Sequence, residues 1–233
     1  MKIKKFRIIC NIIIISMFAI LITYIGASNY NYVFSYQNEN VIYNGNRDSN
    51  KVSLMFNVYW GTEYIMDILD VLNEYDVKST FFVGGTWVEK EPDILNEIIK
   101  NGHEIGNHGY FHKDQEYLNY DQNYDEIAIT HKLVFVNHNY EMNLFAPPSG
   151  SFNKATLESA ENLGYKTIMW SKDTIDWRDK DSNLIFNRAT NNIKGGDLVL
   201  AHPTECTLKA LPLILQYYKI NNITATTVSE CLK

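Results

Sequence analysis

The stretch LMFNVYWG, residues 54–61, marks the end of one predicted strand and the start of a loop. The apolar residues that precede Asn57 are typical of a buried β-strand, and Gly61 marks a turn before a helical pattern. In many α/β enzymes catalytic carboxylates follow such a strand, but this chain has Asn57 and Val58 there. The sequence therefore raises the question of whether this strand end is an active site or the remnant of one.

Strand-like and helix-like segments alternate along the rest of the chain. Helical patterns are predicted at 63–75, 92–102, 120–136, 154–164, 184–193 and 208–219, between strand-like segments. Apolar strands without polar alternation indicate a parallel sheet covered by helices. With about seven such units, a closed or nearly closed barrel is favoured over an open sheet. In either case the functional face lies at the carboxyl ends of the strands.

The first 27 residues predict a membrane anchor. Four basic residues precede an uncharged apolar run, and about 20 such residues are enough to cross a bilayer as one helix. A cleaved signal peptide is the less favoured alternative, because its apolar core is shorter. The basic flank predicts a cytoplasmic N-terminus, with everything that follows the anchor outside the cell membrane.

Two further regions follow the predicted anchor. Residues 28–50 are rich in Asn, Tyr and Ser, lack helical periodicity and are interpreted as a linker. Residues 51–233 have the length of one domain that can bury a full core. Cys206 and Cys231 would face an oxidising compartment and could pair, although two separate thiols are the simpler interpretation.

The charge of the exported part limits the classes of partner. The whole chain has a formal net charge of −6, and without the four basic residues of the anchor it has 17 basic and 27 acidic residues, a net charge of −10. Such a balance argues against nucleic acid and against tight binding of anionic polymers. A neutral or weakly charged substrate fits better.

A pair of histidines indicates a metal site. The segment NHGYFH places His108 and His112 four residues apart, directly after a predicted strand. If the segment forms a helical turn, both imidazoles share one face and can chelate one cation. Two unrelated surface histidines are the alternative.

Other polar residues also follow strands. His202 lies at the exit of the strand LVLA and could protonate a leaving group, or merely cap the strand. Asp173 or Asp176 could orient its imidazole, and Trp177 could supply an apolar wall for a sugar face. The turn PPSG could direct backbone N–H groups at a developing oxyanion, or be only a turn.

Together these segments resemble the polysaccharide deacetylases of the NodB-homology type, carbohydrate esterase family 4. STFFVGG, GHEIGNHGYFH, DTIDW and LVLAHP are close to motif regions of that family in order and spacing, and the resemblance covers residue 51 to the end. It implies a distorted (β/α) barrel and a divalent metal, often zinc. It also implies metal-assisted removal of acetyl groups from N-acetylated sugars of cell-wall or related glycans.

The resemblance assigns roles to individual residues. It implies that His108 and His112 bind the metal. It implies that His202 is the general acid and that Asp176 orients it. The remaining roles are substrate contact for Trp177 and Pro148 and a backbone oxyanion donor for Ser149.

The first and third motifs depart from the family pattern. The first motif, T-F-D-D-G, appears as MFNVYWG, so Asn57 and Val58 replace the base and the third metal ligand. An amide cannot take a proton from water and valine cannot bind metal. The arginine of the third motif is Ala146, which is consistent with the loss of the base that it would orient. Glu63 is a possible substitute ligand or base, but it also suits the positive end of the next helix.

Two functions remain open from the sequence. The first is a deacetylase-like hydrolase of cell-wall or spore-cortex type glycans with weakened activity and a weakly bound metal. The second is a catalytically inactive, membrane-tethered glycan-binding relative. The pattern resembles a subgroup linked to sporulation in spore-forming bacteria. Whether Glu63 points toward His108 and His112 would separate the two functions.

Overall fold

The structure is a computed structural model that describes residues 16–17 and 41–233. Residues 40–233 form one compact unit. In the described part of the chain, no helix is both long enough and apolar enough to cross a membrane. The predicted anchor lies almost entirely outside the described residues.

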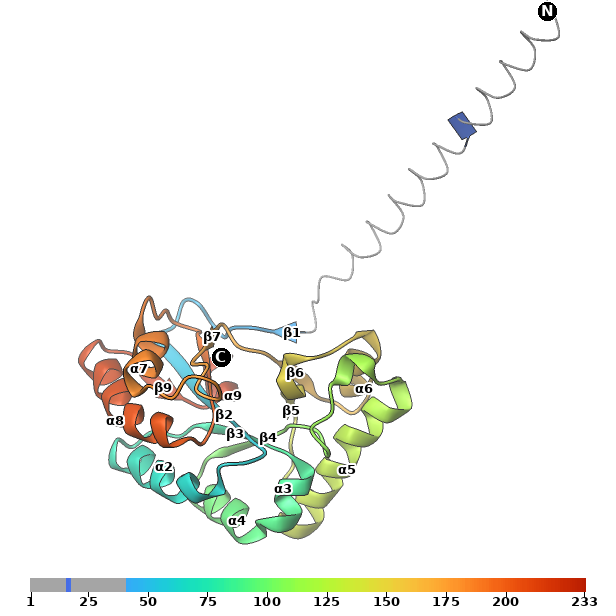
Figure 1. Cartoon of the computed structure of the whole chain (residues 1–233), viewed down its shortest axis with the longest axis horizontal. Coiled ribbons are helices and arrows are strands. Elements are labelled where there is room, and N and C mark those ends of the chain that lie inside the picture. Colours follow the sequence, from blue (N-terminus) through green and yellow to red (C-terminus); the bar gives the residue numbers. More distant parts are fainter. Residues whose placement is uncertain (1–15, 18–40) are drawn as a thin grey trace, which may run out of the picture. The chain divides into compact units, whose positions relative to one another are not determined.

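Parallel strands form a single curled sheet inside this unit (Figure 1). Across residues 41–233 the strand order is β1-β6-β5-β4-β3-β2-β8-β7, with β9 beside the start of β2, and all of these neighbours pair in parallel. The strands are β1 (Val41–Ile42), β2 (Lys51–Val58), β3 (Thr80–Val83), β4 (Glu104–Asn107), β5 (Leu144–Phe145), β6 (Lys166–Ile168), β7 (Lys172–Asp173), β8 (Leu198–Ala201) and β9 (Thr224–Thr226).

The sheet is a curled half-barrel, which corrects the expectation of a closed or nearly closed barrel. β1 and β7 occupy the two ends of the strand order, and each is only two residues long. Strands this short offer few backbone hydrogen bonds with which to join two sheet edges. The parallel arrangement with helical crossovers is confirmed.

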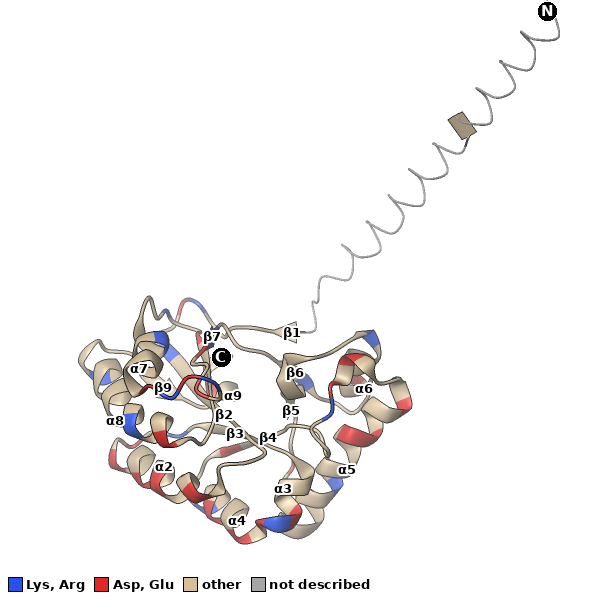
Figure 2. Ribbon diagram, viewed as in Figure 1, with Lys and Arg blue, Asp and Glu red and all other residues tan. Residues whose placement is uncertain are grey.

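Helices cover the outside of the curl (Figure 1). They are α2 (Thr62–Glu74), α3 (Gly85–Lys90), α4 (Pro92–Lys100), α5 (Tyr120–His138), α6 (Lys154–Asn162), α7 (Ser182–Thr190) and α8 (Glu205–Ile220). The short helix α9 (Val228–Cys231) instead packs against inward-facing strand residues, and the 3-10 turns η1 (Gln115–Tyr117) and η2 (Pro148–Gly150) lie in loops. Helix α2 buries Ile65, Ile68, Leu69 and Leu72, the face that its sequence periodicity predicts. Most charged residues lie on these helices and on loops rather than on the strands (Figure 2).

Residues 41–50 belong to the compact unit, although the sequence pattern assigns them to a linker. β1 pairs with β6, and the N–H of Gly45 donates to the carbonyl of Gly196 at 2.7 Å. The N–H of Asn46 likewise donates to the carbonyl of Cys231 at 2.9 Å.

The two cysteines of the domain do not form a disulfide in this structure. Cys231 is buried and, like Cys206, is a free thiol.

The alternation of side chains along β2 decides what faces the concave side of the sheet. Phe56 and Val58 pack among side chains of the covering helices, whereas Met55 packs with inward-facing residues of other strands. Successive strand residues point to opposite faces. Asn57 is therefore on the concave side, and Val58 is on the other side with none of its surface exposed.

Candidate functional site

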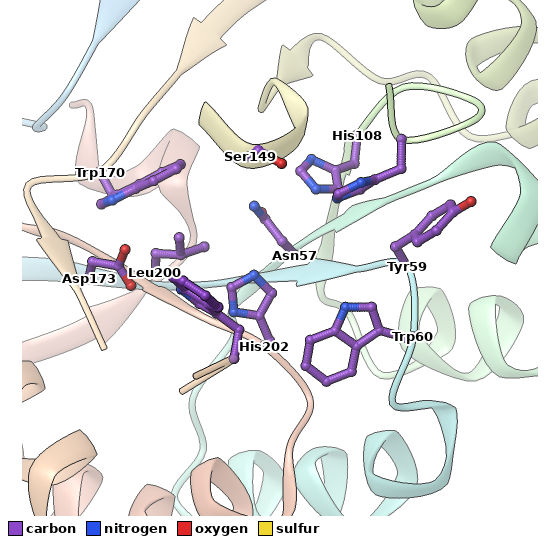
Figure 3. Close-up of a pocket in the computed structure, with 11 residues that line it drawn as sticks. Asn57, Tyr59, Trp60, His108, Ser149, Trp170, Asp173, Leu200 and His202 are labelled. Carbon is purple, nitrogen blue, oxygen red and sulfur yellow. The ribbon is translucent and has the colours of Figure 1, made fainter. Parts of the chain in front are cut away.

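A pocket of about 390 Å³ lies at the carboxyl ends of the strands (Figure 3). It is lined by Asn57, Tyr59, Trp60, His108, His112, Ser149, Trp170, Asp173, Trp177, Leu200 and His202. These residues come from β2, β7 and β8 and from the loops after β2, β4, β5, β6, β7 and β8. The curl of the sheet thus brings together the strand ends at which the sequence predicts a functional site.

His108 and His112 meet across a loop, not on the helical turn that their spacing suggested. The chain reverses because Gly109 and His112 both adopt left-handed backbone conformations, with φ of 72° and 57°. The two imidazole centroids are 5.0 Å apart, with the rings edge to face. Nδ1 of His108 lies 2.7 Å from the carbonyl oxygen of Ala146. That contact requires the proton on Nδ1 and leaves Nε2 as the free lone pair.

Both imidazoles are neutral at physiological pH. Burial, with a contribution from the neighbouring His112, lowers the pKa of His108 to about 3. Burial also lowers the pKa of His112 below its ordinary value. A neutral imidazole is the form that binds a metal ion. These two side chains therefore fit a divalent cation as two of its ligands.

The residues next to this pair do not complete a three-ligand site. Among residues 16–17 and 41–233, no three His, Cys, Asp or Glu side chains gather as a possible metal site. Val58 lies in the core, and Glu63 is exposed in the first turn of α2, outside the set of pocket-lining residues. The donor set fits weak metal binding through His108 and His112 better than tight binding.

His202 and Asp176 form a hydrogen-bonded pair beside the pocket. Nδ1 of His202 lies 2.8 Å from Oδ1 of Asp176, and the backbone N–H of His202 donates to Oδ2 at 2.6 Å. The hydroxyl of Thr207 also donates to Oδ2. These three donors hold the Asp176 carboxylate in one orientation, and the residue is only 3% exposed. This arrangement leaves Nε2 of His202 available to the pocket, as a general acid requires.

Two aromatic residues that the sequence did not predict as site residues cover the imidazoles. The ring of Tyr59 stacks on His112, with centroids 4.6 Å apart, and the indole of Trp60 stacks on His202 at 5.7 Å. Tyr59 also packs against Gly84, where any Cβ would lie 2.7 Å from the Tyr59 ring. The sequence could have indicated both as site residues, because they directly follow β2 in VYWG, at the strand end where a site was expected.

The turn after β5 is more than a connection, because Ser149 lines the pocket. Ser149 has φ of 56°, a left-handed conformation inside η2.

Of the two residues expected to contact substrate, only Trp177 lines the pocket. Pro148 is buried and is not among the lining residues, whereas Trp177 is 55% exposed. Trp170 and Asp173 also line it; Trp170 is a further site residue that the sequence did not predict.

The chain belongs to the polysaccharide deacetylase family. The family model matches residues 44–168. The chain is 36% identical over 191 residues to the uncharacterized protein YlxY of Bacillus subtilis, a match that covers 82% of this chain and 60% of YlxY. It is 34% identical over 176 residues to a peptidoglycan-N-acetylglucosamine deacetylase of Bacillus cereus, covering 73% of this chain and 82% of that enzyme.

Solved structures of the same family are similar in fold. One is a family 4 pseudoenzyme from Bacillus anthracis, with a TM-score of 0.81, 35% identity and coverage of 83% of this chain and 69% of that one. A mutant of that pseudoenzyme with restored enzymatic activity has a TM-score of 0.81 and 33% identity, covering 83% of this chain and 71% of that one. The chain is thus similar both to active enzymes and to a pseudoenzyme of its family.

Proposed function

We propose that this chain binds N-acetylated cell-wall glycan in the pocket and deacetylates it slowly or not at all. The observation that carries the proposal is the end of β2, where Asn57 faces the pocket and Val58 is packed in the core. A general base contributes about 10²- to 10⁴-fold to a rate. Neither side chain can accept a proton from water at neutral pH.

The aromatic lining supports a glycan ligand. Trp60 is 44% exposed and Trp177 is 55% exposed, and both line the pocket. Exposed indole rings offer apolar faces on which a sugar ring can pack, while the pocket supplies polar groups for its substituents. Relatives of this chain are named as peptidoglycan-N-acetylglucosamine and peptidoglycan-N-acetylmuramic acid deacetylases, which supports a peptidoglycan-like polymer.

The hydrogen-bonded pair of His202 and Asp176 favours slow deacetylation over complete inactivity. Asp176 fixes the tautomer of His202 so that Nε2 can deliver a proton to the leaving amine. The backbone N–H of Ser149 would face the developing oxyanion. When bound, a divalent cation held by His108 and His112 polarises the acetyl carbonyl. This machinery lacks a base at Asn57 and a third metal ligand at Val58.

The cofactor and the location are further parts of the proposal. We propose zinc as the weakly held divalent cation, since two imidazoles suit it. We also propose that the N-terminal segment tethers the domain outside the cell membrane, because a basic flank precedes an uncharged apolar run. A role in sporulation rests on the resemblance to the sporulation-linked subgroup alone.

Acetate release and glycan binding by the same protein test the proposal. The full chain in detergent micelles with added zinc should bind hexameric N-acetylglucosamine and release acetate slowly or undetectably. The double variant Asn57→Asp with Val58→Asp should release acetate faster if its thermal unfolding shows that it folds. Adding Ala146→Arg should destabilise the fold further, because Ala146 is fully buried and an arginine side chain is much larger and charged.

Two results would overturn the proposal. No binding of N-acetylglucosamine hexamers or of insoluble peptidoglycan would remove the glycan-binding function. Brisk acetate release by the unmodified chain that disappears in Glu63→Gln would show that Glu63 is the working carboxylate. Glu205→Gln is the matched control, because Glu205 likewise lies exposed in the first turn of a helix, α8.

A further inference from the structure

The loop that joins His108 to His112 is held at its middle by a buried carboxylate. The backbone N–H groups of Tyr110 and Phe111 donate to Oε2 of Glu126, at 2.8 and 2.7 Å. Glu126 belongs to helix α5 and is only 3% exposed. One side chain from a covering helix therefore fixes the backbone between the two imidazoles.

The neighbouring backbone groups of the loop are paired as well. The N–H of Gly109 donates to Oδ1 of Asn107 at 2.9 Å. The carbonyl oxygens of Gly109 and Tyr110 accept the N–H groups of Gly85 and Thr86, at 2.9 and 3.1 Å. Each of these hydrogen bonds limits the conformations that the loop can sample, so the backbone follows one well-defined path.

The charge of Glu126 is compensated where it is buried. Its Oε1 lies 3.2 Å from Nζ of Lys113, and that ammonium group also lies 4.7 Å from the centroid of the Phe111 ring. A buried carboxylate is costly unless hydrogen bonds and an opposite charge offset the loss of water. Here the hydrogen bonds come from the loop, at the short distances typical of charged acceptors. Moving the loop away from Glu126 would leave the carboxylate buried with too few partners.

We infer that Glu126 is a positioning residue that holds His108 and His112 in place for a metal ion. Two protein ligands bind a cation more weakly than three, so any cost of ordering them takes a larger share of the binding free energy. A loop that is already ordered avoids this cost. Glu126 acts through the loop backbone and is not itself a ligand. The inference rests on the metal binding proposed above and does not depend on glycan binding or turnover.

Hydrogen exchange in the unmodified full chain is the first test. The protein is kept in detergent micelles with a chelator present. The backbone amides of residues 109–111 should exchange at least about 100-fold more slowly than in an unstructured peptide, because each donates to a buried acceptor. Mass spectrometry of the peptic peptides that contain this segment measures the rate. Exchange as fast as in an unstructured peptide would overturn the inference, since the loop would then be unordered before metal binds.

Zinc affinity in two variants of Glu126 is the second test. Glu126→Leu removes both acceptor oxygens and should weaken zinc binding at least about tenfold, the scale on which outer partners of metal ligands contribute. Glu126→Gln retains one oxygen that can accept both N–H groups, so its affinity should stay within about threefold of the unmodified chain. Calorimetric titration measures the affinity, and the absorption spectrum of bound cobalt reports the geometry of the two imidazoles.

Glu104→Leu is the matched control. Glu104 lies half-buried at the start of β4, and its Oε2 accepts hydrogen bonds from the Thr80 hydroxyl at 2.6 Å and from the Ser229 N–H at 3.2 Å. It therefore also binds a backbone N–H, but at the opposite end of the strand from the histidine pair. Glu104→Leu should lower the temperature of thermal unfolding and leave both the zinc affinity and the cobalt spectrum unchanged.

The outcomes distinguish this inference from the metal site on which it rests. Unchanged zinc affinity and an unchanged cobalt spectrum in folded Glu126→Leu would overturn the role of Glu126 alone. An equal loss in Glu126→Gln and Glu126→Leu would assign the effect to charge, which also contradicts positioning. No zinc binding by the unmodified chain would remove the proposed cation site and this inference with it. Where Glu126→Leu does not fold, the hydrogen exchange of the unmodified chain decides, because it needs no variant.

Discussion

The indole of Trp60 lies parallel to the imidazole of His202, with 5.7 Å between the ring centroids and 5° between the ring planes. Trp60 lies in the loop directly after β2, whose last two residues, Asn57 and Val58, replace the acidic pair of the first motif, whereas His202 follows β8. The residue Trp60, next to the altered first motif, is therefore in direct contact with the residue that would act as general acid. The first motif, which has lost its acids, thus contacts the LVLAHP segment, which keeps its histidine.

Trp60→Ala should weaken binding of hexameric N-acetylglucosamine by about tenfold. Truncating an aromatic residue at the centre of a binding site commonly costs more than 1 kcal/mol, and about 1.4 kcal/mol is a factor of ten. Trp60→Phe should retain most of the affinity. Leu213→Ala serves as control because Leu213 is half exposed on α8 and lies outside the pocket lining. Unchanged calorimetric affinity in Trp60→Ala would show that the sugar does not pack on this indole.

Gly61→Ala should destabilise the fold more than Gly164→Ala does. Both glycines have φ of 78°, so each substitution carries the left-handed penalty of about 1–2 kcal/mol. A Cβ at Gly61 would also lie 2.0 Å from the carbonyl oxygen of Pro203, whereas one at Gly164 meets nothing within 4 Å. The difference in free energy of unfolding, measured with urea, isolates the clash. Equal losses would mean that the loop moves away from Pro203 without cost.

His108→Ala and His112→Ala should each abolish zinc binding. The unmodified chain should bind zinc more weakly than a site with three protein ligands, because two imidazoles remain and position 58 is apolar. Metal content after dialysis and calorimetric titration measure both effects. His138→Ala is the control, since His138 lies in the last turn of α5. The same zinc content in all four proteins would show that the pair is structural.

Val58→Asp should lower the free energy of unfolding by about 3 kcal/mol or more, as expected for a charge placed in an apolar core without a partner. Val58 has none of its surface exposed and packs with Phe56 and the covering helices. Val136→Asp, at a position that is 69% exposed, should cost little. Urea unfolding of the two variants provides the comparison. A small cost for Val58→Asp would indicate that the end of β2 can turn its side chain toward the pocket.

Stability should fall as pH drops from about 6.5 to about 4, and His103 should account for part of the fall. Burial, helped by the charge of Lys78, lowers the pKa of His103 from 6.5 to about 4. In this window the unfolded chain binds a proton that the folded chain does not, so the free energy of unfolding rises with pH and the contribution is complete above about 6.5. The effect is up to about 3 kcal/mol.

The variant His103→Gln identifies the source of that pH dependence. The N–H of Ser79 donates to Nδ1 of His103 at 3.1 Å, a bond that protonation would break. The variant removes the titrating group, so its free energy of unfolding should depend less on pH between 4 and 6.5. An equally steep dependence in the variant would assign the effect to other groups.

The longer elements were predictable because local sequence determines them. α2 and α4 bury the apolar faces that their periodicity predicts. α3, β1 and β7 were not predicted. β1 and β7 have only two residues each and exist because β6 and β8, which come from other parts of the chain, supply their hydrogen bonds. Patterns over two residues carry no periodicity from which to predict a strand.

The sequence by itself determined the family, the parallel α/β architecture and the chemical identity of the residue at position 57. Only the tertiary structure decided that Asn57 faces the pocket with an unpaired Oδ1 while Val58 faces the core. It also decided that His108 and His112 meet across a left-handed loop, and that Trp60 rests on His202. The reason is that contacts between strand ends depend on the curl of the whole sheet and on the paths of loops, neither of which a local pattern of residues encodes.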